Sequence, residues 1–326
     1  MKAAFFERPG ELKVGDFPDP VRQHGEVLVR VLAAGVNPID RATVSGAVSA
    51  SPMPHVPGAE FVGEVLDPGT SEFKRGDRVV VYNRLFCGSC RQCLRGETQI
   101  CERLGGIIGV AAHGGWAELA AVPSRNLVRT AAPAEEVVGL PVGGLTAFNM
   151  LRRAAVSVGD RVAVVGATGN VGVYAVQLAK LMGAYVAAVT RRADLHAARL
   201  KSLGADEVLT PEEAKKAGPF DVVVDPVGAG TWELSFSLLA RGGRYVTAGA
   251  LTGSEVKLDL RRLYGGQYSV LGSTGGRRAD LELLVSLAER GLLKTPIYKR
   301  YRLEEAAEAL KALEGPERLG KVVITI

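Results

Sequence analysis

Cysteine and histidine are both scarce in this chain of 326 residues, which contains four of each. All the cysteines lie between Cys87 and Cys101, so none remains elsewhere to form a disulfide or to bind a second metal. The histidines are scattered, which is more typical of structural residues than of metal ligands: His24, His55, His113 and His196. The composition therefore allows one cysteine-rich metal site and no obvious second one.

Long apolar runs are also missing, and none reaches the length that a membrane span needs. The first eight residues carry Glu7 and lack the apolar stretch and cleavage site of a signal peptide. The net charge of +5 is spread along the chain, and basic pairs such as Arg152-Arg153 are more typical of solvated faces than of nucleic-acid contacts. We therefore expect a cytoplasmic protein with neither a membrane nor a nucleic-acid partner.

The length exceeds what one compact core usually holds, so two domains are expected. Residues 1–143 contain short runs in which charged residues alternate with Val and Leu, as in 25–31, and Gly and Pro separate the runs. This pattern predicts half-buried antiparallel strands. The segment 273–326 is too short to fold alone, and we expect it to complete this first domain.

Residues 144–272 have a different pattern, in which apolar runs alternate with helical periodicity. Strands are predicted at 162–165, 185–189, 207–209, 221–224, 244–248 and 269–272, and helices at 170–182, 194–203 and 230–240. Continuous Val-rich strands separated by helices predict a parallel sheet that is covered on both faces. The predicted fold class is therefore α/β, with a doubly wound Rossmann domain of six strands beside a β-rich domain.

A glycine-rich loop stands between the first of these strands and its helix. Glycine lets the backbone approach a pyrophosphate, and the N-terminus of the helix offers oriented N–H groups. The expected dinucleotide loop comprises Gly166, Ala167, Thr168, Gly169, Asn170, Val171 and Gly172.

The residues directly after the second strand indicate the type of dinucleotide. An acidic residue there would bind the adenosine ribose, but the chain has Thr190, Arg191 and Arg192 instead. Arginine matches the geometry and charge of a 2′-phosphate, which favours NADPH. The alternative is that both arginines are solvated and Asp194 caps the next helix.

The cysteine cluster has four members within fifteen residues: Cys87, Cys90, Cys93 and Cys101. Four nearby thiolates suit a tetrahedral zinc with no open position, so we expect one structural zinc per chain. An iron–sulfur cluster is disfavoured because the fourth cysteine is distant and no proline follows it. An empty or oxidised lobe remains the other alternative.

This lobe, followed by a late Rossmann segment, resembles the medium-chain dehydrogenase/reductase superfamily, in particular its zinc-containing alcohol dehydrogenases. The resemblance extends over nearly the whole chain, through Gly35 to Asp40, Pro57 to Gly63, Gly114 to Glu118, Leu145 to Ala147 and Gly320 to Val323. It implies a GroES-like catalytic domain (1–143 and 273–326, with the zinc lobe at 87–101), a Rossmann domain (144–272), a substrate cleft between them, and a homodimer or homotetramer. We also expect cofactor contacts from Asp225, Gly249, Gly272 and Lys321.

The chain departs from this family where a second, catalytic zinc would be held. The positions of the family's ligands, which are Cys, His and Cys or Asp, are occupied by Asn37, Ala59 and Val142. Only Glu60 remains nearby, and one carboxylate cannot make an open zinc site. This loss, with the Gly-Val-Asn-x-x-Asp motif ending at Asp40, resembles the quinone oxidoreductases, although those generally lack the zinc lobe.

The sequence therefore predicts an NADPH-dependent enzyme that transfers hydride to a small apolar ketone, quinone or conjugated carbonyl without a catalytic metal. Asn37 is expected to stabilise the developing oxyanion, Thr146 to seat the nicotinamide, and Asp40 either to orient groups or to cap a turn. Two alternatives remain open. One is a zinc-dependent alcohol dehydrogenase with a displaced metal at Glu60, and the other is a non-catalytic NADPH-binding protein.

Overall fold

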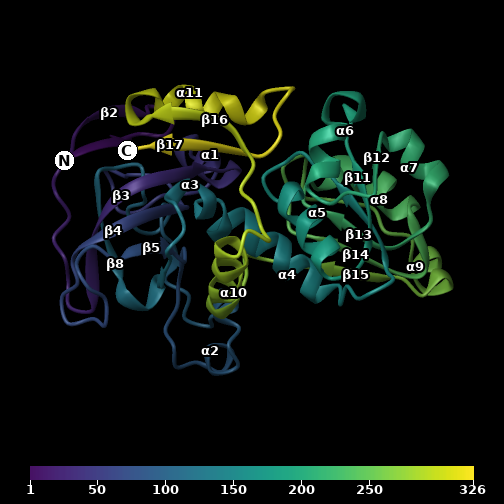
Figure 1. Ribbon diagram of the computed structural model, residues 1–326, viewed down its shortest axis with the longest axis horizontal. Coiled ribbons are helices and arrows are strands. Elements are labelled where there is room, and N and C mark those ends of the chain that lie inside the picture. The colour runs from purple at the N-terminus through teal and green to yellow at the C-terminus, as the bar shows by residue number, and fades with distance from the viewer. The chain divides into compact units, whose positions relative to one another are not determined.

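The computed structural model describes all 326 residues, which form two compact units: Met1–Val142 with Gly276–Ile326, and Gly143–Gly275. Both ends of the chain lie in the first unit (Figure 1). None of the helices combines the length and the apolar character that a bilayer crossing requires.

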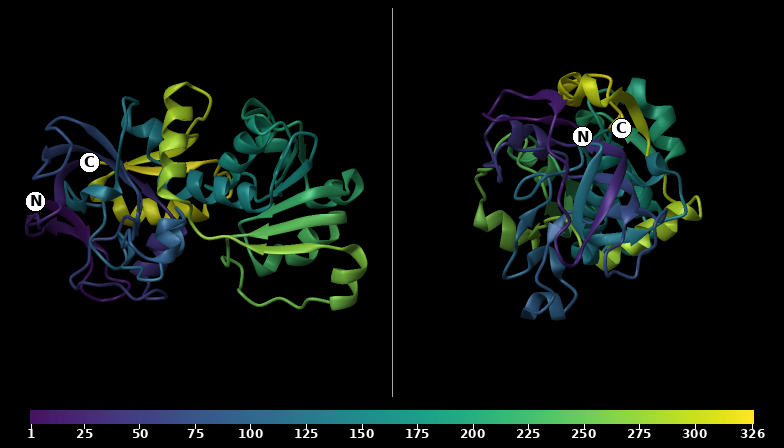
Figure 2. Two further views of the ribbon diagram at one scale, coloured as in Figure 1. Left: turned by 90° about the horizontal axis from the view of Figure 1, so that it is seen from below. Right: turned by 90° about the vertical axis from the view of Figure 1, so that its left-hand side faces the viewer.

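The first unit is built around a mostly antiparallel sheet of seven strands in the order β16-β17-β3-β4-β5-β9, with β8 paired to the first half of β3. The last strand of the chain, β17, lies between β16 and β3, so the C-terminal segment completes this sheet (Figure 2). The strands of the unit are β1 Lys2–Phe5, β2 Lys13–Asp16, β3 Glu26–Val36, β4 Phe61–Asp67, β5 Arg78–Val81, β6 Arg84–Leu85, β7 Gly106–Ile107, β8 Leu119–Pro123, β9 Leu127–Arg129, β16 Ile297–Arg302 and β17 Lys321–Thr325. Its helices are α1 Pro38–Val44, α2 Arg91–Leu94, α3 Ala134–Val137, α10 Arg278–Glu289 and α11 Ala306–Lys311.

The core of this unit follows from the alternation along its strands. In β3 the side chains of Val27, Val29 and Val31 are buried, whereas Arg30 between them is exposed. The buried residues pack with Phe61 and Trp116 into one apolar cluster. The predicted half-buried antiparallel strands are therefore present.

The second unit contains a six-stranded parallel sheet in the order β12-β11-β10-β13-β14-β15. Its strands are β10 Arg161–Val165, β11 Tyr185–Val189, β12 Glu207–Leu209, β13 Phe220–Asp225, β14 Leu239–Thr247 and β15 Ser269–Gly272. Its helices are α4 Leu145–Arg153, α5 Gly172–Leu181, α6 Ala193–Ser202, α7 Pro211–Ala217, α8 Trp232–Ser237 and α9 Leu260–Gly266. Strand order reverses between β10 and β13, which is the switch point where Rossmann folds bind dinucleotides.

Consecutive residues are buried along the central strands of this sheet, as in Val162 to Val165 and Val186 to Val189, so both of its faces are covered. The predicted fold class, a doubly wound sheet with a separate β-rich domain, is confirmed. One element differs in extent. The helix predicted over 230–240 ends at Ser237, and the chain enters β14 at Leu239, where it pairs with Phe220.

Candidate functional site

The glycine-rich loop joins β10 to α5 in the second unit, as the sequence predicted. The loop closes on itself, because Gly169 N–H donates to the Gly166 carbonyl at 2.9 Å. A Cβ on Gly172 would lie less than 3.0 Å from the same carbonyl, so only glycine fits at the start of the helix. The tight loop therefore lies directly against the first N–H groups of α5. This is the arrangement with which helix N-termini bind a pyrophosphate.

The segment after β11 places Thr190 below the surface and both arginines on it. Thr190 Oγ1 accepts a hydrogen bond from Arg192 N–H at 3.4 Å, which holds the turn into α6. Arg191 and Arg192 are exposed, and neither guanidinium forms an ion pair within the protein. Two cationic groups are therefore available to an anion at the end of the second strand.

Asp225 lies at the end of β13, where it organises the loop after that strand. Its carboxylate is fully buried and accepts hydrogen bonds from Thr231 Oγ1 at 2.8 Å, from Ser235 Oγ at 2.7 Å, and from Val227 N–H at 2.9 Å. Gly249, after β14, packs directly against this loop. The structure thus gives Asp225 a positioning role, and its contact with the cofactor stays a prediction.

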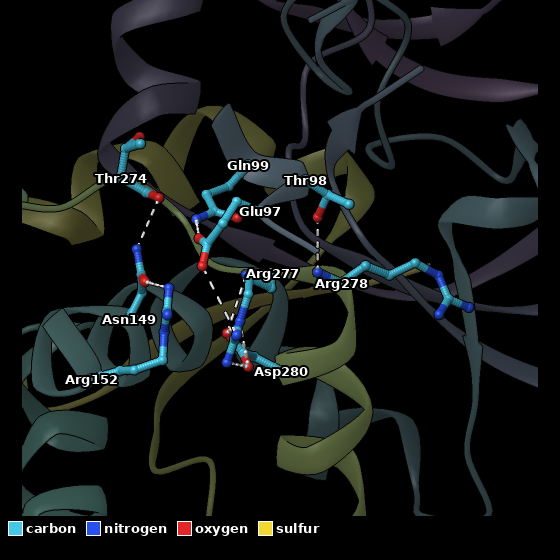
Figure 3. A network of polar contacts seen from close by, with 9 residues as sticks. All are labelled: Glu97, Thr98, Gln99, Asn149, Arg152, Thr274, Arg277, Arg278 and Asp280. Atoms are coloured by element: carbon cyan, nitrogen blue, oxygen red, sulfur yellow. Dashed lines mark hydrogen bonds and ion pairs between the residues drawn. The ribbon is translucent and has the colours of Figure 1, made fainter. Parts of the chain in front are cut away.

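Thr146 lies in the first turn of α4, a helix that the sequence patterns did not predict. Figure 3 shows Asn149 of the same helix donating to the Thr274 carbonyl, at 3.2 Å, while its own oxygen accepts from Arg152 at 2.8 Å. The chain leaves this unit just after Thr274. Gly272 is the last residue of β15 and immediately precedes this segment.

In the first unit, Asn37, Asp40, Glu60 and Lys321 form one fully buried polar cluster. Asn37 precedes α1, and its N–H donates to Asp40 Oδ2 at 2.7 Å. The other oxygen of Asp40 accepts from Ala59 N–H at 2.8 Å. Asp40 therefore caps α1 and also ties it to the loop before β4, while its role in orienting reacting groups stays a prediction.

Glu60 and Lys321 form an ion pair at the centre of the cluster. Lys321 Nζ also donates to Asn37 Oδ1 at 2.8 Å, and Asn37 Nδ2 donates to Glu60 Oε2 at 2.9 Å. The second oxygen of Glu60 accepts from Val142 N–H at 2.8 Å. Burial lowers the pKa of Lys321, and the attraction of Glu60 opposes that shift.

This cluster does not fit a catalytic zinc. Alanine and valine supply no ligand atom at two of the three positions, and an amide is a poor zinc ligand at the third. Both oxygens of Glu60 already have partners, one of which is a cation. A displaced metal at Glu60 would therefore have to remove the Lys321 ammonium.

The cysteine lobe, in contrast, fits zinc. The four sulfur atoms lie within 4.8 Å of one another, and pairs such as Cys90–Cys101 and Cys87–Cys101 are separated by 3.8 and 3.5 Å. A tetrahedral zinc with bonds of about 2.3 Å would separate its sulfurs by roughly 3.8 Å. Hydrogen bonds from backbone N–H groups, with that of Ser89 the strongest, lower the pKa of Cys87 to about 5, which favours a thiolate.

The lobe is anchored to the rest of its unit by polar contacts at residues 97–99. Arg278 N–H donates to Thr98 Oγ1 at 3.1 Å, and Glu97 lies between Gln99 and Arg277 (Figure 3). Arg277 in turn pairs with Asp280 at 2.7 Å, at the start of α10. A metal that orders the lobe would therefore also stabilise the start of α10.

The structure brings Asn37, Asp40 and Lys321 together in one unit, and the glycine-rich loop, Thr190 to Arg192, Asp225 and Thr146 in the other. Sequence reasoning missed the contact between Glu60 and Lys321. The one signal for it is a lysine at the start of the apolar strand β17.

Comparison with known proteins assigns both units to described families. Residues 23–133 match the alcohol dehydrogenase GroES-like domain, and residues 170–290 match the zinc-binding dehydrogenase domain. The chain is 34% identical to an NAD-dependent alcohol dehydrogenase of Sulfolobus acidocaldarius, over the full length of both. It is 32% identical to an acryloyl-coenzyme A reductase of Metallosphaera sedula, over 96% of each chain.

Among solved structures, a thermostable alcohol dehydrogenase from Pyrobaculum aerophilum superposes with a TM-score of 0.97 at 57% identity, covering 100% of this chain and 99% of that one. These matches confirm the family that the motifs predicted. The chain is an oxidoreductase that belongs to the zinc-containing alcohol dehydrogenase family of the medium-chain dehydrogenase/reductase superfamily.

Proposed function

We propose that the protein is an NADPH-dependent oxidoreductase that transfers hydride to an apolar ketone, quinone or conjugated carbonyl without a metal at the substrate. The observation that carries this proposal is the ion pair of Glu60 with Lys321. It places a lysine ammonium on Glu60, a carboxylate beside the family's catalytic zinc position. Ala59 and Val142 make the remaining surroundings apolar.

The preference for NADPH rests on Arg191 and Arg192. Both are exposed, neither is paired, and none of the three residues directly after β11 is a carboxylate that could bind a ribose hydroxyl. Charge-assisted hydrogen bonds from guanidinium to phosphate are among the strongest that proteins form. The Sulfolobus acidocaldarius relative is named NAD-dependent, so both cofactors must be measured side by side.

NADPH, when bound, supplies the hydride, and the chain must position it and stabilise the oxygen that becomes negative. The glycine-rich loop at the start of α5 would hold the pyrophosphate, and Thr146 would support the nicotinamide. Asn37 is the amide donor that we assign to the developing oxyanion. Loss of one such donor typically lowers the rate by about 10²–10³-fold, so Asn37→Ala should lower kcat by that order.

A substrate panel with NADPH and NADH, combined with metal analysis, tests the proposal. The panel should contain apolar ketones, quinones, enones and an enoyl thioester, because one relative is an acryloyl-coenzyme A reductase. We expect turnover with NADPH and one zinc per chain. Two zincs per chain would indicate a zinc-dependent alcohol dehydrogenase, and saturable NADPH binding without turnover would indicate a non-catalytic protein.

We also propose that the protein forms a homodimer through β15. This strand is the edge of the parallel sheet, and its Val270 is 42% exposed. Leu260 and Tyr264 of the neighbouring α9 are 66% and 72% exposed. Exposed apolar edges pair readily with a second strand. Sedimentation should show that Val270→Lys dissociates the dimer, whereas the same substitution at Val158, an exposed position outside the sheet, does not.

A further inference from the structure

The first unit contains an apolar cavity of about 490 Å³ that neither the zinc lobe nor the buried polar cluster lines. It lies between the segments 17–21, 52–54 and 111–114 and strand β8. Most of its walls are alanine, proline, valine, leucine, methionine and phenylalanine side chains. Pockets of about 300–1,000 Å³ with apolar walls and a few polar groups are the usual sites of small organic ligands.

Hydrogen bonds between two loops hold the walls of this cavity together. The two ring nitrogens of His55, which is fully buried, lie 3.1 Å from the Pro52 carbonyl oxygen and 3.0 Å from the Gly109 carbonyl oxygen. Gly114 N–H donates to the Val56 carbonyl at 2.8 Å. The two loops are therefore fixed relative to each other without a ligand. A cavity that is already formed binds its ligand with a smaller loss of conformational entropy.

One uncharged side chain offers the cavity a hydrogen-bond donor. His113 lines the cavity, and its Nδ1 accepts from Val56 N–H at 3.3 Å. Burial, together with the neighbouring His55, lowers the pKa of His113, so its ring is neutral at pH 7. A neutral imidazole whose Nδ1 is an acceptor carries its proton on Nε2. This Nε2–H has no acceptor within the chain, and the ring of Phe17 packs against the imidazole at 5.3 Å.

The charged groups around the cavity select against a charged ligand. Its charged side chains are Asp19 and Glu26, and no lysine or arginine lines it. The Met1 ammonium pairs with Asp19 at 2.6 Å, and Glu26 accepts from Gln23 N–H at 2.9 Å. An anion would therefore meet two carboxylates and no free cation, whereas an organic cation would have to displace Met1 from Asp19. An uncharged molecule meets neither obstacle.

We propose that this cavity is a second binding site of the protein, which takes a small, uncharged apolar molecule whose carbonyl oxygen accepts a hydrogen bond from His113. All the lining residues belong to the first unit, and none belongs to the cluster around Asn37. The inference therefore does not rest on the proposed function. Because the ligand chemistry overlaps with that of the proposed substrates, the experiment must count bound molecules rather than only detect binding.

Prodan, an uncharged naphthyl ketone whose fluorescence moves to shorter wavelength in apolar surroundings, is a suitable probe for the full-length, zinc-loaded protein without NADPH. Ala121→Trp fills the cavity from β8, and Ala112→Trp fills it from the loop at 111–114. Ala131→Trp is the matched control, because Ala131 is exposed and lies outside the cavity. Each filling variant should bind one prodan molecule fewer per chain than wild type, whereas the control should bind as many as wild type. Circular dichroism shows which variants are folded and can be compared.

His113→Phe tests the hydrogen bond, since it keeps an aromatic ring and removes the donor. It should weaken prodan binding at this site by about 2–10-fold, the order expected for one hydrogen bond. It should not weaken the binding of the same naphthylamine without its propionyl group. An analogue with a carboxylate in place of that group should bind wild type more weakly than prodan does.

The proposal is wrong if both filling variants bind as many prodan molecules as wild type, or if His113→Phe weakens the ketone and the carbonyl-free amine equally. It is also wrong if sedimentation shows that the filling variants change the oligomeric state, because a second chain would then cover the cavity. Failure of the proposed function is distinct, since it would appear in wild type as two zincs per chain or as no turnover. It would leave the difference of one prodan molecule between wild type and Ala121→Trp unchanged.

Discussion

The buried carboxylate of Asp40 should make the stability of the first unit fall as pH rises through 6. Its side chain is fully buried, and burial raises its pKa from 3.8 to about 6, against the opposing hydrogen bonds from Ala59 and Asn37 N–H. If the unfolded chain keeps the ordinary value, the pKa difference is about 2.2, which corresponds to about 3 kcal/mol. This is a considerable fraction of the net stability of a typical domain.

The sign of the effect is set by proton binding. Because the folded pKa lies above the unfolded one, the folded state binds more protons between these two values. The stabilising contribution is complete below the unfolded pKa and is lost as pH rises through 6. Between pH 5 and pH 7.5, the loss should amount to about 1.4 kcal/mol.

Asp40→Asn isolates this effect, because it removes the titration and keeps the size of the side chain. Guanidinium unfolding at pH 5 and pH 7.5, followed by circular dichroism, gives the free energy of unfolding of both proteins. The free energy of unfolding of wild type minus that of Asp40→Asn should be about 1.4 kcal/mol smaller at pH 7.5 than at pH 5. Any effect of the amide on stability that does not depend on pH is the same at both pH values, so it cancels in this comparison.

Asp77→Asn is the matched control for a carboxylate with the opposite behaviour. The hydrogen bond from Lys74 N–H holds the pKa of Asp77 below its usual range, and the Asp77 side chain is partly exposed. The difference in the free energy of unfolding between wild type and Asp77→Asn should therefore change little between pH 5 and pH 7.5, and in the opposite direction. If the free energies of unfolding of wild type and Asp40→Asn differ by the same amount at both pH values, Asp40 does not titrate in this range. Burial would then not be the dominant influence on its pKa.

Three further predictions concern the cofactor, the zinc lobe and the packing at Gly35. The double variant Arg191→Ala/Arg192→Ala should raise KM for NADPH by about 10–100-fold and leave KM for NADH nearly unchanged. Arg199→Ala, at an exposed position of α6, is the control, and equal losses with both cofactors would refute a 2′-phosphate contact. Cys101→Ser should lower the zinc content, measured by atomic absorption, from one per chain toward zero and lower the free energy of unfolding; unchanged zinc would refute ligation by Cys101. Gly35→Ala should lower the melting temperature sharply, because its Cβ would lie less than 3.0 Å from the side chains of Glu60 and Lys321. Gly15→Ala is the control, since its Cβ would lie 3.9 Å from Phe5, and similar melting temperatures of the two variants would refute the close approach at Gly35.

Local patterns were sufficient to predict the centre of the Rossmann domain. The run Arg161–Val165, the glycines after it and the helical periodicity beyond them predict β10 and α5, since strand, turn and helix each have their own signal within a few residues. The same patterns failed at the end of α8. Leu238 and Leu239 suit a helix or a strand equally, and pairing with Phe220 decides between them.

The polar cluster could be predicted only in part. Asn37, Asp40 and Glu60 stand within 24 positions of each other and belong to recognisable motifs, so the family resemblance indicated them. Lys321 is 284 positions from Asn37, and the two meet only because β17 pairs with β3. No periodicity reports such a contact, because the strand register depends on the whole sheet rather than on its local sequence.

The positions that correspond to the family's zinc ligands are held in place by other side chains of this chain. Asp40 holds the backbone at Asn37 and Ala59, and Glu60 holds the backbone at Val142, so all three positions are fixed by carboxylates rather than by ligands. Exchange of the side chains at those positions therefore leaves the loops in place. In this family, the chemistry of the site can change while the fold and the cofactor domain stay the same.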